Sequence, residues 1–80
     1  MHFKGLDLNL LAPLDVLLHE KNTTRAGERL CLSQSAVSGA LARLREYFKD
    51  ELLVQAGRGF VLTLLAENLI APMSAFLQQI

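Results

Sequence analysis

Apolar residues recur at helical spacing near the start of the chain. They are Leu11, Leu14, Leu17 and Leu18. Positions three or four residues apart lie on one face of a helix, so this pattern predicts a helix with a buried side. Asp7 can cap this helix and Asn22 can end it, which gives a first helix over residues 8–20. Pro13 lies inside the pattern, where its missing N–H group bends or loosens the first turns.

A second, shorter helix is predicted over residues 25–30, with Thr23 or Thr24 as its cap. Gly27 lies inside it and lowers helix propensity by about 1 kcal/mol relative to alanine. We therefore expect a packing reason for this glycine, namely the close approach of another helix. The next two residues form a tight connection to a third helix.

The third helix has two faces of different chemistry. Ser33 can cap it, and it runs to about Phe48. One face carries bulky apolar residues, and the opposite face carries only small or hydrogen-bonding residues. The apolar stripe is Val37, Leu41, Leu44 and Phe48, and the opposite face is Gln34, Ser35, Ser38, Gly39 and Ala42. Because Arg43 and Arg45 flank this smooth polar face, we expect it to lie against a partner.

The pattern changes after residue 51. Two β-prone runs, residues 52–55 and 60–62, surround a glycine-flanked turn, which predicts a hairpin with Arg58 at its tip. Thr63 can then cap a last helix that extends to the end of the chain, and Pro72 should bend that helix. Its wide apolar stripe is Ala66, Leu69, Ile70, Met73, Phe76, Leu77 and Ile80.

The order of these elements predicts a mainly α fold. Three helices followed by a two-stranded wing fit a winged helix-turn-helix domain over residues 1–62, and the last helix occupies residues 63–80. The stripe on this last helix is wider than the other helices can cover, and 51% of the chain is hydrophobic. We therefore expect a homodimer. The predicted dimer residues are Leu69, Ile70, Met73, Phe76, Leu77 and Ile80.

Charge is distributed unevenly along the chain. The net charge is zero, which argues against nucleic-acid binding, because DNA phosphates are neutralised by Lys and Arg. Between Lys21 and Arg58, however, seven Lys and Arg side chains stand against four Asp and Glu side chains, an excess of three positive charges. The basic part of the chain therefore contains both the third helix and the hairpin.

These features together favour DNA binding. The major groove admits one helix, and Ser and Gln side chains near the start of that helix reach base edges and phosphates. Gln34 can pair bidentately with adenine, and Ser35 or Ser38 can bond to a base or a phosphate. Arg43 and Arg58 would contact the DNA backbone or a groove, with Arg58 reaching from the wing toward the minor groove. The alternative is a winged helix used for protein–protein assembly, with incidental DNA affinity, which the zero net charge supports.

Other classes of function find little support in the sequence. Asp, Glu, His and Cys are too dispersed to propose a nucleophile with its base, so we expect no enzyme. One cysteine and two scattered histidines predict no metal and no cofactor. We interpret Cys31 as a small apolar residue beside its leucine neighbours, with a redox sensor as the alternative. No apolar run approaches the roughly 18 residues of a membrane span, and the start lacks a secretion signal, so we expect no membrane partner and a cytoplasmic location.

The residues also carry a family resemblance. The stretch from Thr24 to Ser38 resembles the N-terminal signature of LysR-type transcriptional regulators. The leucines that continue this signature are Leu41, Leu44, Leu52 and Leu53. Residues 3–11 and 43–52 resemble the branch that contains nodulation-gene activators and regulators of aromatic-compound degradation. The resemblance covers essentially the whole chain.

This resemblance implies a winged helix-turn-helix domain whose last helix, residues 63–80, is a linker helix for dimerisation. It implies a bacterial transcription regulator that reads an interrupted inverted repeat in double-stranded DNA as a dimer, and often as a tetramer at full length. It also implies that a small-molecule effector acts through a C-terminal domain, so we expect this chain to be the truncated N-terminal part of a longer protein. The DNA contacts carried over are Thr24 and Ser33 for phosphate, Gln34, Ser35 and Ser38 for base edges and nearby phosphates, and Arg58 for the wing.

The chain departs from the family's pattern in three places. Gly39 stands where many members have an arginine that can contact DNA, and Gln55 replaces a common arginine at the base of the wing. Leu64 and Leu65 stand where a proline and a small residue often open the linker helix. Because the predicted DNA-binding surface has fewer cations than that of the relatives, we expect a monomer to bind DNA poorly and a dimer to bind it effectively.

Overall fold

The computed structural model describes residues 5–78. Within them, a short 3₁₀ helix, η1 (Leu8–Leu10), leads into α1 (Leu11–Glu20), which is followed by α2 (Thr23–Leu30) and α3 (Gln34–Phe48). The strands β1 (Leu53–Ala56) and β2 (Gly59–Leu62) form an antiparallel hairpin, and α4 (Leu64–Gln78) follows it. This order confirms the predicted winged helix-turn-helix with an additional helix after the wing.

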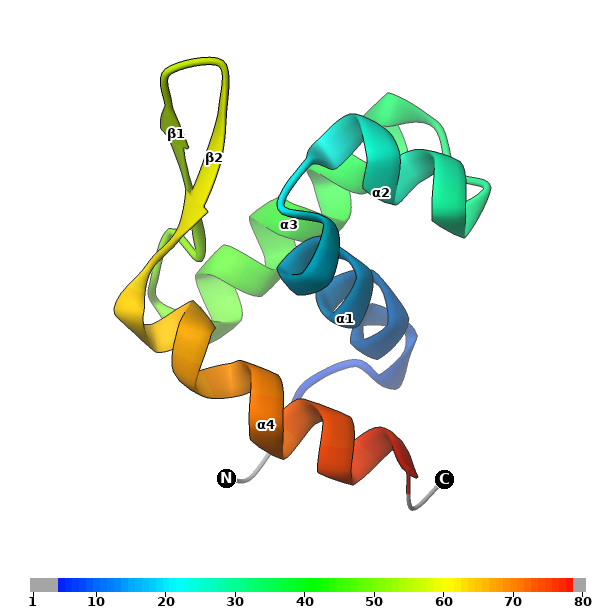
Figure 1. Ribbon diagram of the computed structural model, residues 1–80. Helices are drawn as coiled ribbons and strands as arrows, with labels where there is room; N and C mark the ends of the chain where they lie inside the picture. Colours follow the sequence, from blue (N-terminus) through cyan, green and yellow to red (C-terminus); the bar gives the residue numbers. More distant parts are fainter. Residues whose placement is uncertain (1–4, 79–80) are drawn as a thin grey trace.

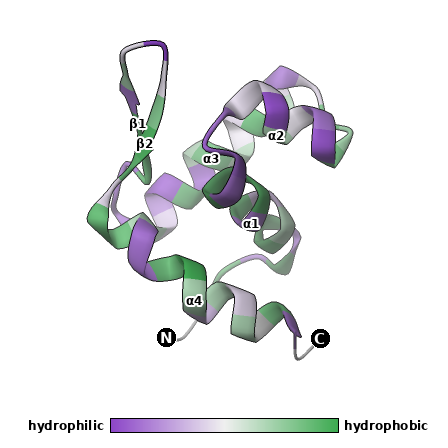
Figure 2. Ribbon diagram, in the orientation of Figure 1, coloured by the Kyte–Doolittle hydropathy of each residue, from purple (hydrophilic) through white to green (hydrophobic). Residues whose placement is uncertain are grey.

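The helices surround α1 (Figure 1), which contacts α2, α3 and α4. The hairpin projects from the body, and both its tip and the start of α3 lie on the side away from α4. Hydropathy follows the same division, because α1 and α4 are mostly apolar whereas α2 and the hairpin tip are mostly polar (Figure 2). The apolar helices build the body of the domain, and the polar elements face outward.

The core contains side chains from every α-helix and from the wing. The leucines of α1 lie at its centre, and burying one leucine contributes about 1.5–3 kcal/mol. The residues with 1% exposure or less are Leu14, Leu17, Leu18, Ala26, Val37, Leu44, Leu52, Leu53, Ala66, Leu69 and Met73. Helix α4 therefore shares one core with the winged helix-turn-helix.

The start of the first helix is tighter than an α-helix. Asp7 caps it as predicted, because its carboxylate accepts a hydrogen bond from the N–H of Asn9 at 2.9 Å. The first turn is η1, and α-helical geometry begins only at Leu11. Pro13 gives the reason, since it has no N–H group to donate to the carbonyl of Asn9. The predicted loosening at Pro13 is thus a 3₁₀ turn.

The boundary between α1 and α2 differs from the prediction. Lys21, not Asn22, ends α1, and it does so in a left-handed conformation with a φ of 53°. Asn22 caps α2, because its side-chain oxygen accepts a hydrogen bond from the N–H of Arg25 at 2.9 Å. Helix α2 begins at Thr23, so neither Thr23 nor Thr24 is its cap. Asparagine is favoured both after a helix and before one, and propensity alone does not separate these roles.

Gly27 permits the close turn between α2 and α3. A Cβ atom at this position would lie 3.1 Å from the carbonyl oxygen of Leu32 and 3.2 Å from a methyl group of Val37. The predicted packing reason is therefore confirmed, although the closest neighbour is the turn itself. Cys31 lies exposed in this turn with a φ of 57°, so its interpretation as an apolar packing residue is wrong. The turn determines its position, and its side chain points away from the core.

Leu52 is not part of the first strand, contrary to the prediction. It has a φ of 65°, which costs a residue with a branched side chain on the order of 1–3 kcal/mol. Its side chain is 1% exposed, and its N–H donates to the Asp50 carboxylate at 2.8 Å. Burial and this hydrogen bond offset the strain, and β1 begins one residue later.

Helix α4 begins as predicted, because the Thr63 hydroxyl accepts a hydrogen bond from the N–H of Ala66 at 3.2 Å. The helix continues across Pro72. Leu69 and Met73 are fully buried in the chain's own core, so their assignment to a dimer interface is wrong. Ile70 and Leu77 are half-buried and pack against the core. Two other predicted dimer positions, the side chain of Phe76 and the whole of Ile80, lie outside the described residues.

We predict opposite responses of two helical glycines to alanine. Nothing lies within 4 Å of a Cβ atom at Gly39, so Gly39→Ala should raise the free energy of unfolding by about 0.5–1 kcal/mol. Gly27→Ala should give no gain or a loss, because the new methyl group meets the carbonyl of Leu32, which is held in the turn. Urea unfolding of both variants measures the difference. An equal gain in both would contradict the packing role of Gly27.

Candidate nucleic-acid interface

The outer face of α3 is built by its cap and its helical period. The Ser33 hydroxyl accepts a hydrogen bond from the N–H of Ala36 at 3.1 Å, so the helix begins at Gln34. The apolar side lies in the core, as predicted, through Val37, Leu41 and Leu44. The residues of the outer face, Gln34, Ser35, Ser38, Gly39 and Ala42, are all exposed. Without bulky side chains on this face, another molecule can approach the helix backbone closely.

Gln34 is held at the start of this face. Its side-chain nitrogen donates to the Thr23 hydroxyl at 3.3 Å, across 11 residues of sequence. A glutamine amide has two N–H donors and one carbonyl oxygen, so one donor and the oxygen stay available. These are the two groups that a bidentate contact to adenine uses. The sequence suggested Thr23 only as a cap, and its role as a partner of Gln34 becomes visible only in the fold.

The same bond places the beginnings of α2 and α3 side by side. Thr24 and Ser33, predicted to contact phosphate, are both exposed there. The first N–H groups of a helix carry a partial positive charge and favour anions. Two such helix starts together form a local environment suited to phosphate, although the whole chain has no net charge.

Arg58 lies at the tip of the wing, as predicted. The strands pair from Leu53 with Leu62 to Ala56 with Gly59, and Gly57 and Arg58 form the two-residue turn between them. Gly57 has a φ of 60°, which glycine adopts without strain at the first position of a type II′ turn. Within the described residues Arg58 has no ion pair within 4 Å and is exposed, so its guanidinium is available to a partner.

Arg45, predicted to flank the outer face of α3, is bonded within the domain. Its guanidinium donates to the carbonyl of Glu51 at 2.8 Å and to the carbonyl of Leu53 at 2.9 Å, both at the base of the wing. Arg29 is also engaged, in an ion pair with Glu20 at 2.9 Å. Arg45 and Arg29 are therefore engaged within the domain, whereas the guanidinium of Arg58 is free at the tip of the wing.

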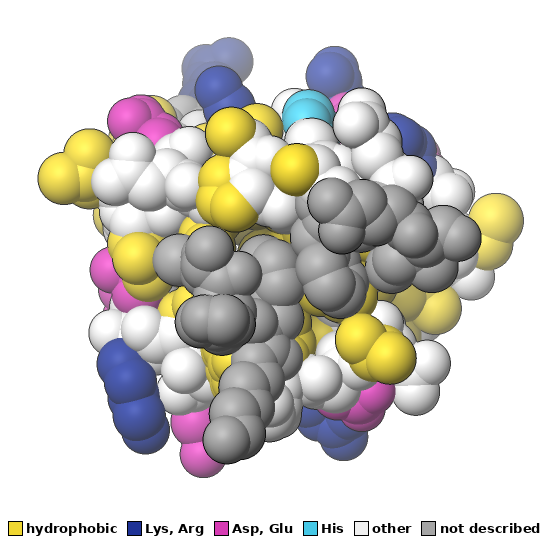
Figure 3. Space-filling view, turned by 90° about the horizontal axis from the view of Figure 1, so that it is seen from below, with side chains coloured by type: hydrophobic (Ala, Val, Ile, Leu, Met, Phe, Trp, Pro, Cys, Tyr) yellow, Lys and Arg dark blue, Asp and Glu magenta, His cyan; other side chains and the backbone are white. Residues whose placement is uncertain are grey.

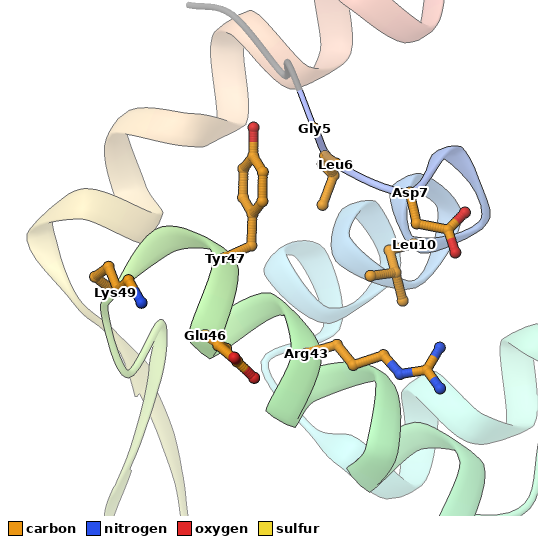
Figure 4. A pocket seen from close by; sticks show the side chains of 8 residues that line it. All are labelled: Gly5, Leu6, Asp7, Leu10, Arg43, Glu46, Tyr47 and Lys49. Atoms are coloured by element: carbon orange, nitrogen blue, oxygen red, sulfur yellow. The ribbon is translucent and has the colours of Figure 1, made fainter.

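Arg43 lies on the flank of α3 opposite to Arg45. It lines an open hollow between this helix and residues 5–10 (Figure 4). The other lining residues are Gly5, Leu6, Asp7, Leu10, Glu46, Tyr47 and Lys49. Two cationic and two acidic side chains share the hollow, so it has no net charge that favours an anion. Arg43 thus borders the outer face of α3 from the side of the N-terminal segment.

The described part of the chain offers little basis for other kinds of site. No group of three or more His, Cys, Asp or Glu side chains in it is arranged to hold a metal ion. Its helices are also too short or too polar to cross a membrane. The outer face of α3, the joined helix starts and the wing tip remain as the candidate interface.

The fold and this surface define the class of protein, a winged helix-turn-helix DNA-binding domain of a transcription regulator. The model of the bacterial regulatory helix-turn-helix proteins of the lysR family matches residues 8–67, and the chain belongs to this family. It is 56% identical over 73 residues to "Nodulation protein D" of Bradyrhizobium sp. (strain ANU 289), which covers 91% of this chain and 22% of that protein. The predicted resemblance is confirmed. The chain spans about a quarter of the length of such relatives.

Solved structures agree with this assignment. A probable transcriptional regulator from Pseudomonas aeruginosa is 42% identical, with a TM-score of 0.86 over 92% of this chain and 25% of that chain. The BenM DNA-binding domain, solved in a complex with catB site 1 DNA, has a TM-score of 0.82 at 22% identity, over 92% of this chain and 83% of that chain. At that identity the second comparison supports the fold alone.

The cap of α3 gives a prediction for stability. Ser33→Ala removes the bond to the Ala36 N–H and should lower the free energy of unfolding by about 1 kcal/mol. Ser33→Asp should retain the stability, since a carboxylate caps a helix equally well. Chemical denaturation measures both, with Ser35→Ala as the matched control because Ser35 is exposed and two positions beyond the cap. A loss of the same size in the control would contradict the capping role.

Proposed function

We propose that this domain reads an interrupted inverted repeat in double-stranded DNA as a homodimer. The observation that carries the proposal is the exposed outer face of α3, which is small and polar and begins where two helix starts meet. The major groove has the width of one helix, and a face without bulky side chains lets α3 enter it deeply. The wing tip lies on the same side of the domain and reaches DNA beside the groove.

Each predicted contact has a role in this arrangement. Thr24 and Ser33 bind phosphates at the joined helix starts, and the N–H groups there add to the attraction. Gln34, Ser35 and Ser38 read base edges or bind nearby phosphates, because they occupy the first turns of α3. Arg58 reaches the minor groove from the wing, and Arg43 contacts the backbone from the flank of α3.

The comparisons support this proposal from two directions. The relatives named "Nodulation protein D" are 51% to 56% identical to this chain. The BenM and CbnR DNA-binding domains were solved with DNA, and they share this fold. In the alternative, an assembly module with incidental DNA affinity, the outer face of α3 would meet a protein instead of the major groove.

The dimer is proposed to form through α4. This helix lies on the side away from the reading face, where hydrophobic side chains are open to solvent (Figure 3). Leu64 is 74% exposed, and the exposed residues Asn68, Ala71 and Ala75 continue its line along the outer side of the helix. Ile70 and Leu77 border this line and are half-buried. Small residues flanked by larger apolar ones let a second α4 pack closely, and two copies would place two α3 helices on successive turns of DNA.

The whole protein is proposed to extend beyond this domain. Because the chain matches about a quarter of its relatives' length, we propose that a small-molecule effector acts through a C-terminal domain and that two dimers form a tetramer at full length. The domain itself would act by binding, without catalysis or a cofactor. Its location would be the cytoplasm, where bacterial DNA lies.

Operator binding is the first test. Sequences selected from random DNA should bind in a gel-shift assay, and affinity should fall steeply with salt. Arg58→Ala should weaken binding about tenfold and reduce the salt slope by about 1, because it removes one cation from the DNA. Ser38→Glu should weaken binding by on the order of 100-fold, since it places a bulky anion on the reading face.

Arg29→Ala is the matched control for this test. It also removes one arginine, but that arginine is paired with Glu20, so affinity and salt slope should change little. Binding that is indifferent to Ser38→Glu, Arg58→Ala and salt would exclude the proposed function and favour the assembly module.

Sedimentation tests the dimer. Ala71→Glu places a charge on the outer side of α4 at an exposed position, so the domain should fold but sediment as a monomer. Its affinity for the inverted repeat should fall, while affinity for a single half-site should not. Ala12→Glu, at an exposed alanine of α1, is the control and should stay dimeric. Dimers in both variants would show that α4 does not form the interface by this side.

A further inference from the structure

The wing has few contacts with the body of the domain. Leu53, Phe60 and Leu62 on its inner side reach the core. On the outer side the paired residues Val54 and Val61 are 42% and 51% exposed. Residues 54–58, which include the turn that carries Arg58, are all exposed. The direction of the wing is therefore fixed at its base.

Arg45 is the first group that fixes the base. It extends from α3 and donates to two backbone carbonyls on the way into β1, those of Glu51 and Leu53, at 2.8 and 2.9 Å. Two bonds from one planar guanidinium define an orientation and not only a distance. The Glu51 carboxylate lies 3.8 Å away and largely in solvent, so the two carbonyls are the main partners. The reading helix and the first strand are thereby joined directly.

Asp50 is the second group. A single oxygen of its carboxylate, Oδ2, accepts bonds from the N–H of Leu52 at 2.8 Å and from the hydroxyl of Thr63 at 2.5 Å. The N–H of Thr63 in turn donates to the carbonyl of Leu52 at 3.0 Å. Residues 50, 52 and 63 thus close a ring of hydrogen bonds. This ring joins the entry of the hairpin to its exit and to the cap of α4.

We propose that Arg45 and Asp50 are positioning residues, which set the direction of the wing and so place Arg58 on the DNA. This inference rests on the proposed function. Four strand residues at about 3.3 Å each put the tip roughly 13 Å from the base, so a tilt of about 10° moves it by about 2 Å. Such a shift exceeds the distance range of a hydrogen bond. Positioning at the base therefore controls the contact at the tip.

The geometry at Asp50 supplies a matched pair of variants. Because one oxygen accepts both bonds, Asp50→Asn can keep them with its amide oxygen, whereas Asp50→Ala loses them. Both variants remove the same negative charge. Any difference between them therefore comes from the hydrogen bonds and not from repulsion of DNA.

The position of the wing can be measured without DNA. Native Cys31 is exposed at the turn before α3, and Arg58→Cys adds a second thiol at the wing tip. Spin labels on both, in protein diluted with unlabelled chain, report the distance between body and tip. We expect a narrow distribution in the parent and in Asp50→Asn, and a broad or shifted one in Asp50→Ala. Arg45→Met, which removes both donors, gives the same test if Asp50→Ala does not fold.

DNA affinity provides the second readout, with Arg58 restored. Asp50→Ala should lose about as much affinity as Arg58→Ala, on the order of tenfold, while Asp50→Asn should bind as the parent does. In an Arg58→Ala background the two Asp50 variants should bind equally, because the wing no longer has a contact to lose. A role in stability alone would lower affinity in both backgrounds.

The outcomes separate the inference from the proposed function. Identical distance distributions in Asp50→Asn and Asp50→Ala, or a difference in affinity that persists without Arg58, overturn the positioning role. A parent chain that binds no selected DNA overturns the proposed function, and the label distances still decide whether the base directs the wing.

Discussion

Burial of α1 is the constraint on which the rest of the domain depends. A chain of 80 residues can form one core, and Leu14, Leu17 and Leu18 occupy its centre with almost no exposed surface. The other three helices all pack on α1, so each has to turn its apolar side inward. The polar side of α3 is consequently turned outward. The surface that defines the class of protein is therefore a result of how the core is filled.

The wing is held at its base by hydrogen bonds to backbone groups as well as by packing of its inner side. Its inner side contributes to the core, but its tip projects beyond the body. Arg45 and Asp50 bond to backbone groups at its base, and Leu52 accepts a strained conformation there. Charged side chains are used at this junction because a turn between a helix and a strand leaves carbonyl and N–H groups that need partners. The domain thus combines a packed body with a hydrogen-bonded wing.

Much of this fold could be predicted from local chemistry. The caps Asp7, Ser33 and Thr63 were visible because a polar side chain preceded an apolar helical period, and all three accept the expected bonds. The prediction from sequence was wrong where one residue suits two local roles. Asn22 suits both a helix end and a helix cap, and Leu52 has the propensity of a strand residue but forms a left-handed turn. Such choices depend on contacts that form only after the chain has folded.

The sequence by itself determined the order of elements, the two faces of α3 and the family, since each is written in the spacing and type of neighbouring residues. Only the tertiary structure decided which apolar residues of α4 belong to the core, because Leu69 and Met73 are buried by helices distant in sequence. It also decided that Thr23 holds Gln34 and that Arg45 holds the wing. A spacing pattern records the period of one helix. It contains no information on which neighbouring element will cover a given side, and that is settled by packing across the whole domain.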